Sequence, residues 1–305
     1  LYYNKTALEA AGVVCISVDA KDIAAFNAGT LADYNGKKKA DYGLTVDIPA
    51  KGYFRSNNPY YCDGSDFSGS LWRYPTGSVL VFNDRISCSW DEIEDLGMLM
   101  TKTKNKSSTT DYGYYTEWWF NYCWSVGGDC IEYIETDDAA YNGGYWDFTL
   151  MDNTKNYIVA DDNEEGYDIN GNHYEAGEII SWNDKLNDPE TNKTVRSSIV
   201  ADAESGKLNE LPSQREAFVE FVRIGQKSTV EVDNGLKGYG ICPAPTSLGG
   251  DSGKTAAFAQ GSLAMLVDGR WNVVDFRKKM DDKWLWDVAP LPQYKEYDDE
   301  GNINV

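Results

Sequence analysis

The sequence is poor in basic residues and in histidine, and it has no long apolar runs. Its 305 residues include 28 lysines and arginines against 49 aspartates and glutamates, a formal net charge of −21. Binding to a phosphate backbone needs clustered cations, so this balance argues against a nucleic-acid-binding protein. A single histidine, His173, argues against a Ser-His-Asp triad and against a multi-histidine metal site. No apolar run approaches a membrane span, and the composition predicts a soluble globular protein.

Cysteine is sparse, and its spacing carries no metal motif. The 6 cysteines include no C-x-x-C pair, which argues against a zinc knuckle or a thioredoxin-like motif. An even count is compatible with disulfides and equally with free thiols. Cys123 and Cys130 are the nearest pair along the chain. The sequence predicts no metal site and no cofactor.

Aromatic residues with a polar atom are abundant. The chain has 10 tryptophans and 21 tyrosines beside 10 phenylalanines. Such side chains suit half-wet surfaces, including clefts that bind sugars or peptides, although some of them will be core residues.

Strand and helix patterns alternate, which predicts an α/β fold. Capping-box pairs, Ser89 with Glu92 and Ser213 with Glu216, open two of the helices. Strands are predicted at residues 1–4, 79–82, 262–268 and 286–292, and helices at 5–11, 89–102, 116–127, 213–226, 255–260 and 271–280. Regions 19–85 and 130–210 show little periodicity and are expected to be irregular insertions, with one strand candidate at 145–152.

Two loops partly match known ligand-binding motifs, but neither has all the residues or the spacing that its motif requires. Residues 161–166 follow the first positions of a calcium loop, but Asn172 occupies the twelfth position, where an EF-hand needs glutamate. A solvated acidic loop is favoured, and an irregular calcium site is the alternative. The segment GGDSGKT lacks the spacing of a P-loop because Gly249 is only four residues before Gly253. It is interpreted as a flexible loop before a helix.

One turn combines residue types that favour ligand binding. The apolar run SLAMLVD ends at Gly269, Arg270 and Trp271, and a helical pattern follows. Ligands of open α/β sheets bind at the carboxyl ends of strands. There Gly269 lets the backbone turn without a Cβ clash, and Trp271 is placed to stack on the apolar face of a sugar. The alternative is that Trp271 only packs the helix against the sheet.

The same segment resembles a family motif. FAQGSLAMLVDGRW followed by WDVAPLP is similar to the C-terminal-lobe motif of the family 1 extracellular solute-binding proteins, which serve ABC importers and include the maltose-binding proteins. LYYNKTALEAAG resembles the family's hinge strand and helix, and SWDE stands where the family has T-W-x-E. The residues that match F-x-x-G-x-x-A-M-x-x-x-G-x-W are Phe258, Gly261, Ala264, Met265, Gly269 and Trp271.

The resemblance implies a periplasmic-binding-protein type II-like lobe, an α/β domain with a mixed sheet flanked by helices. Residues 1–305 would form mainly the second, C-terminal lobe with its hinge strands, and the N-terminal lobe and C-terminal helices would be missing. Regions 19–85 and 130–210 exceed the family's connections and would be expanded insertions. We therefore expect the chain alone to bind ligand weakly or not at all.

The resemblance also implies ligand-binding residues. In the family, the helix matched by TEWWFNYCWSVGGD presents contacts from the second lobe, so Glu117 would accept sugar hydroxyls and Trp118 or Trp119 would form a stacking platform. Adjacent helix residues point about 100° apart, so only one tryptophan can face the cleft. Trp118 begins a step-of-four stripe that looks buried, which favours Trp119. Trp271 would be a second stacking ring, with Gly269 beside it and Arg270 as a hydrogen-bond donor.

The function implied by the resemblance is capture of a sugar or oligosaccharide between two lobes for import, without catalysis. The partners would be the sugar and the membrane permease subunits of an ABC importer, and the receptor would be a monomer. The full-length protein would be extracellular and lipid-anchored at the cell surface. Two alternatives stay open: a surface carbohydrate-binding module with aromatics on an exposed sheet face, and a glycoside hydrolase that uses paired carboxylates among Glu117, Asp129, Glu132 and Glu135.

Overall fold

The computed structural model describes residues 1–56, 77–180, 199–248, 251–280 and 283–297, apart from positions 152, 154, 170, 200, 228 and 229. The chain forms two compact units. Unit 1 contains Leu1–Glu117 and Val222–Gln293, and unit 2 contains Trp118–Phe221 and Tyr294–Val305. No helix in the described ranges is long and apolar enough to span a membrane.

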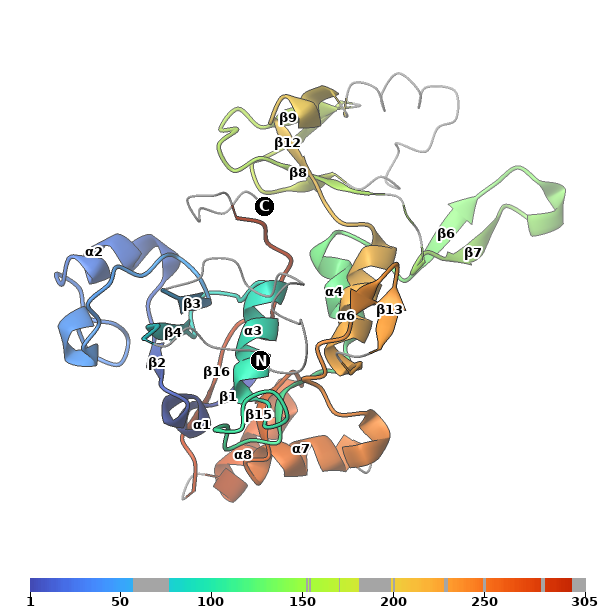
Figure 1. Ribbon diagram of the computed structural model, residues 1–305. Coiled ribbons are helices and arrows are strands. Elements are labelled where there is room, and N and C mark those ends of the chain that lie inside the picture. Colours follow the sequence, from blue (N-terminus) through green and yellow to red (C-terminus); the bar gives the residue numbers. More distant parts are fainter. Residues whose placement is uncertain are drawn as a thin grey trace. The chain divides into compact units, whose positions relative to one another are not determined.

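The first sheet of unit 1 is mixed and has the strand order β16-β1-β15-β5 (Figure 1). Its strands are β1 (Tyr2–Asn4), β5 (Tyr112–Tyr115), β15 (Leu263–Leu266) and β16 (Trp286–Val288). The first strand runs antiparallel to both of its neighbours, whereas β15 and β5 are parallel. The carboxyl ends of β15 and β5 therefore meet at one edge of the sheet.

Two helices cover this sheet, α7 (Asp251–Ala259) and α8 (Val273–Met280), which contact each other in Figure 1. Aromatic rings fill the space between the helices and the strands. The ring of Tyr2 lies edge-on to Phe276 at 5.0 Å, and Phe258 lies 5.0 Å from Phe276. Phe258 and Phe276 are fully buried, so this aromatic cluster fixes the helices on the sheet.

Helix α3 (Trp90–Met100) packs against β5 with almost no side chain between them. A Cβ atom on Gly113 would come within 1.9 Å of the carbonyl oxygen of Gly97, so position 113 must be glycine. The predicted capping box starts the helix: the Ser89 hydroxyl accepts from the Glu92 N–H at 3.1 Å, and the Glu92 carboxylate accepts from the Ser89 N–H at 3.2 Å.

The second sheet of unit 1 has the order β2-β4-β3, with β2 and β4 parallel. Its strands are β2 (Val13–Ile16), β3 (Tyr53–Arg55) and β4 (Leu80–Asn83), and helix α1 (Lys5–Ala10) leads from β1 into β2. Residues 19–56 are not an irregular insertion, because they form α2 (Ile23–Asn27), two 3₁₀ turns and β3. Their apolar side chains share one core with β2 and β4; its members include Phe26, Leu44, Ile48 and Val81.

The described part of unit 2 is built from short antiparallel strands and helical segments. The expectation of an irregular region 130–210 is wrong, since most of its described residues lie in or between three small sheets, ordered β6-β7, β11-β8-β12 and β10-β9. The strands are β6 (Ile131–Glu135), β7 (Gly144–Phe148), β8 (Tyr157–Val159), β9 (Tyr167–Ile169), β10 (Asn172–Tyr174), β11 (Ile179–Ile180) and β12 (Leu208–Glu210). Tyr157, Val159, Ile180, Ile199 and Leu208 form the buried core of the β8 sheet.

Two labelled helices and the helical residues 201–204 belong wholly or partly to the described part of unit 2. Helix α4 (Trp119–Ser125) ends at Gly127, which has a φ of 72°, as predicted. Helix α6 (Gln214–Gly225) crosses the boundary between the units and carries the second predicted capping box. There the Glu216 N–H donates to the Ser213 hydroxyl at 3.2 Å. A further hairpin, β13 (Glu231–Asp233) with β14 (Leu236–Lys237), follows in unit 1.

The architecture is therefore mixed α/β with mixed sheets and helices, which confirms the predicted class at that level. Strands β1, β4, β15 and β16 and helices α1, α3, α7 and α8 lie within a few residues of their predicted positions, whereas β2, β3, β5 and α2 were not predicted. One element differs in kind. The segment GGDSGKT is not simply a loop before a helix, because α7 already begins at Asp251.

Candidate functional site

The carboxyl ends of β15 and β5 carry the best-developed polar site of unit 1. Beyond β15, the Val267 N–H donates to the Tyr115 carbonyl at 2.9 Å, which continues the parallel pairing by one residue. Asp268 then follows β15 and Glu117 follows β5, so the two acidic side chains leave the same edge of the sheet. This is the place at which α/β sheets bind ligands.

Lys254 joins the two carboxylates. It lies on α7 and is only 7% exposed. Its ammonium group bonds to Oε1 of Glu117 and lies 3.5 Å from Oδ2 of Asp268. The Asp268 side chain is 3% exposed, whereas that of Glu117 is 34% exposed. Glu117 is thus held in a fixed orientation with part of its carboxylate open to solvent, and Tyr115 also donates to its Oε2 at 3.3 Å.

Lys254 is the site residue that the sequence interpretation missed. Positions 254, 257 and 258 are all buried on α7, which is the i, i+3, i+4 pattern of an inward helix face. A lysine within such a stripe needs carboxylate partners because burial of an unpaired ammonium is costly. That pattern was the available signal, and it was lost because the segment was interpreted as a loop.

Trp271 lies in the turn that follows. The 3₁₀ turn Arg270–Asn272 connects β15 to α8, and its Trp271 side chain is 70% exposed. The indole lies over Gly269, since a Cβ atom there would come within 2.1 Å of two ring carbons. The Tyr2 hydroxyl donates to the Gly269 carbonyl at 2.8 Å and fixes the turn on the sheet.

The role predicted for Gly269 needs one correction. Its φ of −74° and ψ of 158° are open to any residue, so no tight turn requires glycine there. The Trp271 ring occupies the space of a Cβ atom at this position, so a larger residue there would displace the ring. Asp268 Oδ1 accepts from the Gly269 N–H at 2.7 Å, so the residue beneath the Trp271 ring is bonded to the carboxylate that pairs with Lys254. Arg270 is exposed on the same turn.

Trp118 and Trp119 belong to unit 2, where the prediction about them is partly wrong. Tyr122 and Val126 are buried as expected, but Trp118 precedes α4 with a ψ of 65° and is only half-buried. The step-of-four stripe fails at Trp118 because the helix has not yet begun. Trp119 is also half-buried, and its ring lies edge-on to Phe218 at 6.2 Å. Both tryptophans therefore have packing roles within unit 2.

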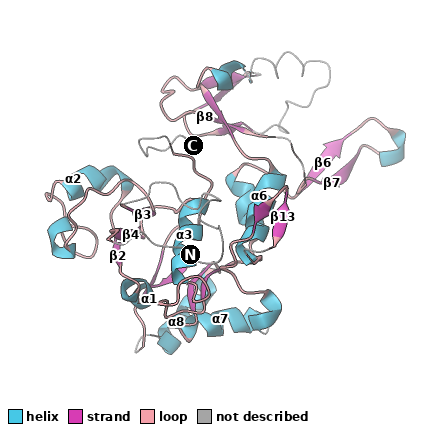
Figure 2. Cartoon of the chain, in the orientation of Figure 1, coloured by secondary structure: helices cyan, strands magenta, loops and turns pink. Residues whose placement is uncertain are grey.

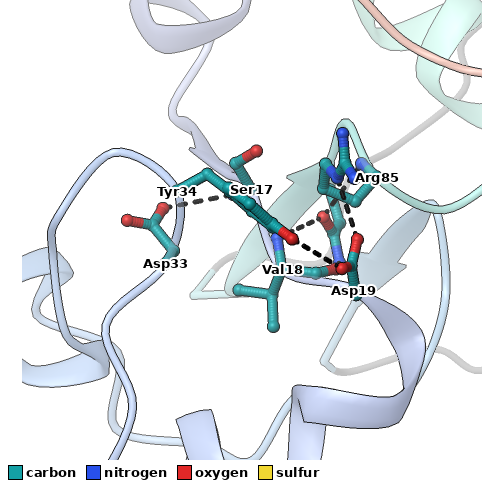
Figure 3. Close-up of polar contacts among 7 residues, drawn as sticks. Ser17, Val18, Asp19, Asp33, Tyr34 and Arg85 are labelled. Carbon is teal, nitrogen blue, oxygen red and sulfur yellow. Dashed lines mark hydrogen bonds and ion pairs between the residues drawn. The ribbon is translucent and has the colours of Figure 1, made fainter.

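A second polar cluster lies at the carboxyl ends of the other parallel pair, β2 and β4 (Figure 3). Arg85 Nε donates to Asp19 Oδ1 at 2.9 Å, and its guanidinium carbon lies 4.6 Å from the centre of the Tyr34 ring. The Tyr34 hydroxyl closes the triangle by donating to Asp19 Oδ2 at 2.8 Å. Hydrogen bonds from Tyr34 and Arg85 hold the pKa of Asp19 below its usual value. The arrangement exposes a guanidinium stacked on a ring.

Asp33 organises the loop that carries Tyr34. Its carboxylate accepts from the Ser17 N–H at 3.1 Å, the Lys37 N–H at 2.9 Å and the Tyr42 hydroxyl at 2.6 Å. Burial alone would raise the pKa of Asp33, but hydrogen bonds from Tyr42, Lys37 and other donors lower it overall. These hydrogen bonds therefore favour the ionised Asp33 carboxylate in this loop.

Asp84 lies beside this cluster and links it to the first sheet. The Tyr3 hydroxyl donates to Asp84 Oδ2 at 2.8 Å, while Tyr2 contacts the Trp271 turn from the same strand. Burial raises the pKa of Asp84, and hydrogen bonds from Ser17 and Tyr3 oppose that rise. Strand β1 thus contacts both polar edges of unit 1 through adjacent tyrosines.

The remaining sequence candidates form no site within the described residues. In the acidic loop 161–166, the Asn163 amide donates to the Gly166 carbonyl at 3.0 Å, and the described part of the chain contains no group of three residues able to hold a metal ion. Asp129 and Glu135, two of the proposed paired carboxylates, are exposed in unit 2, whereas Glu117 belongs to unit 1. Cys62 lies outside the described residues, and the described cysteines are free thiols: Cys15, Cys88, Cys123, Cys130 and Cys242.

Comparisons with protein-family models, with curated proteins and with solved structures found no match for this chain.

Proposed function

We propose that the chain is the sugar-binding lobe of a solute-binding protein that serves an ABC importer, with a periplasmic-binding-protein type II-like fold. The observation that supports this most is the Trp271 ring, 70% exposed and held over Gly269 at the carboxyl end of β15. The C–H face of a pyranose packs on such an exposed ring.

The charged groups beside the ring suit sugar hydroxyls. Lys254 holds the Glu117 carboxylate in place, and the exposed part of that carboxylate can accept hydroxyl hydrogen bonds. Arg270, exposed on the Trp271 turn, can donate to hydroxyl oxygens. Aromatic stacking with charge-assisted hydrogen bonds is the chemistry of a binding site, and none of these groups is assigned a catalytic step.

In this proposal a first lobe supplies the opposite wall, and the ligand favours closure only through contacts with both lobes. The closed receptor, a monomer outside the cell with a lipid anchor, then delivers its cargo to the membrane permease. Gly269, beneath the Trp271 ring, completes the proposed binding residues of unit 1, and Trp118 and Trp119, which pack within unit 2, are not included.

The test is a thermal-shift panel of mono- and oligosaccharides on the full-length protein that the resemblance implies, with both lobes present. A bound sugar stabilises only the folded state, so it raises the melting temperature of wild type and not of Trp271→Ala. Trp124→Ala is the matched control, because Trp124 is 58% exposed and lies outside the turn. A shift that survives in Trp271→Ala contradicts the proposal, and release of sugar fragments would favour the glycoside hydrolase.

A further inference from the structure

Strands β6 and β7 form a hairpin that pairs with no other described strand (Figure 2). We call residues 131–148 the aromatic arm. Ile131 is opposite Phe148, and Tyr133 is opposite Trp146. Paired residues share a face and alternate residues return to it, so these four side chains lie on one face of the hairpin.

This face is open to solvent. Ile131 is 48% exposed, Tyr133 45%, Trp146 68% and Phe148 75%. Side chains of these sizes expose roughly 500 Å² together, which is as large as the functional patches found on many soluble proteins. A lone two-stranded hairpin is marginally stable in water. Covering this face would therefore stabilise the arm as well as bury apolar area.

The charge around the arm limits what can cover it. No lysine or arginine occurs between Lys106 and Lys155. Glu135, opposite Gly144, lies on the same face as Trp146, and Asp137 and Asp138 lie in the turn, whereas Asp147 alternates to the other face. A second copy of the arm would bring like charges together, and an anionic lipid surface would repel them. A basic surface complements this rim.

A sugar fits the face less well than a protein does. The Tyr133 and Trp146 rings are inclined at 60° with centres 5.3 Å apart, so they offer no common flat platform. Ile131 and Phe148 have no group that could bond a hydroxyl. Tryptophan and tyrosine at the centre of an apolar patch are the residues that contribute most at protein interfaces.

We infer that the aromatic arm docks on a protein partner with a basic surface, its Trp146 face entering an apolar groove and its carboxylates pairing with lysines and arginines at the rim. The inference is independent of the sugar-binding proposal, because all its residues belong to unit 2.

The test measures binding of a fluorescent peptide, (Lys-Val)₄, which carries the chemistry of such a partner on one strand. Matched peptides (Ser-Val)₄ and (Glu-Val)₄ remove or reverse its charge. Wild-type protein should bind the lysine peptide at least tenfold tighter than either of the others, and added salt should weaken that binding. The double variant Trp146→Ala/Phe148→Ala should weaken it at least tenfold, and Glu135→Lys, on the same face, at least threefold.

Controls separate the arm from the overall negative charge. Trp124→Ala removes another exposed tryptophan of unit 2, and Glu204→Lys reverses another exposed acid there. Both should change the affinity less than twofold, with circular dichroism confirming that every variant is folded. Equal losses in arm and control variants overturn the inference, as does equal binding of the three peptides. Competition by an oligosaccharide, or a wild-type dimer that the double variant loses, also overturns it.

Discussion

Replacing Lys254 with methionine tests the charge network that holds the proposed site. Methionine keeps the length of the side chain and removes the ammonium group between Glu117 and Asp268. At 3.5 Å, the attraction between Lys254 and Asp268 is about 5 kcal/mol for an effective dielectric constant of 20. Because the Glu117 side chain is about a third exposed, water can take the place of Lys254 beside it, and the pair between Lys254 and Glu117 contributes less than about 1 kcal/mol.

Breaking a buried ion pair on one side costs about 3–5 kcal/mol, and we expect that loss in the free energy of unfolding of unit 1. Urea unfolding followed by circular dichroism measures it. Lys279→Met on α8 is the matched control, because its pair with Asp275 is exposed and i,i+4, and its loss should cost less than about 0.5 kcal/mol.

A second variant distinguishes charge from packing. In Lys254→Met/Asp268→Asn no carboxylate remains buried and unpaired, so at least half of the lost stability should return. The reasoning is refuted if Lys254→Met costs less than about 1 kcal/mol, or if the double variant is no more stable than the single one.

Three further outcomes follow from individual residues. Burial raises the pKa of Asp84, so the folded state holds the Asp84 proton more tightly than the unfolded state does. The free energy of unfolding should therefore fall as pH rises from the unfolded pKa of about 3.9 through the folded pKa. Melting temperatures measured from pH 3 to 8 should show this fall for wild type and not for Asp84→Asn. Burial raises the pKa of Cys15, Cys123 and Cys242 to about 12, so little of each thiol is ionised at pH 8. Because the thiolate is the reactive form, iodoacetamide at pH 8 should label each of them about a thousandfold slower in the folded protein than in urea, as measured by mass spectrometry. Ser89→Ala should cost about 1 kcal/mol of stability by calorimetry, and an unchanged value would contradict the role of the capping box.

Local signals predicted helices in both units where these helices carry such signals in full. The capping boxes at Ser89 and Ser213 start their helices where predicted, and Gly127 ends α4. Strand β5 was not predicted, although YGYY pairs with β15 and completes the site. A four-residue strand next to a helical pattern carries too little periodicity to be separated from it.

The hairpins were missed although a turn signal was present. Asn-Gly occurs at 142–143, 170–171 and 234–235, before β7, between β9 and β10, and between β13 and β14. Asn142 and Asn234 both have positive φ, with values of 48° and 41°; Asn234 lies in the two-residue turn between β13 and β14, and Asn142 ends the 3₁₀ turn before β7. Strand β7 corresponds to the strand candidate at 145–152, but strands of two or three residues show no alternation, so only the turn residues could have revealed the other hairpins.

The candidate site was predicted in its exposed members and missed in its buried one. Trp271 and Arg270 were named because they follow a predicted strand, whereas Glu117 was named through the family resemblance. Lys254 needed the helix register, and Trp118 was assigned to a buried stripe because the start of α4 was placed too early. An error of one turn in the predicted start of a helix changes which residues are assigned to its buried face, and the site residues on that helix are then assigned wrongly.

Calorimetric titration of the full-length protein with the sugar identified in the panel tests the central claim most directly. Stacking on a fixed indole contributes about 1.5–3 kcal/mol, so Trp271→Ala should weaken binding at least tenfold while Trp271→Phe recovers part of the loss. Trp124→Ala should leave the affinity unchanged. Equal affinity of wild type and Trp271→Ala would contradict the account, because the turn over Gly269 would then serve only to pack α8 on the sheet.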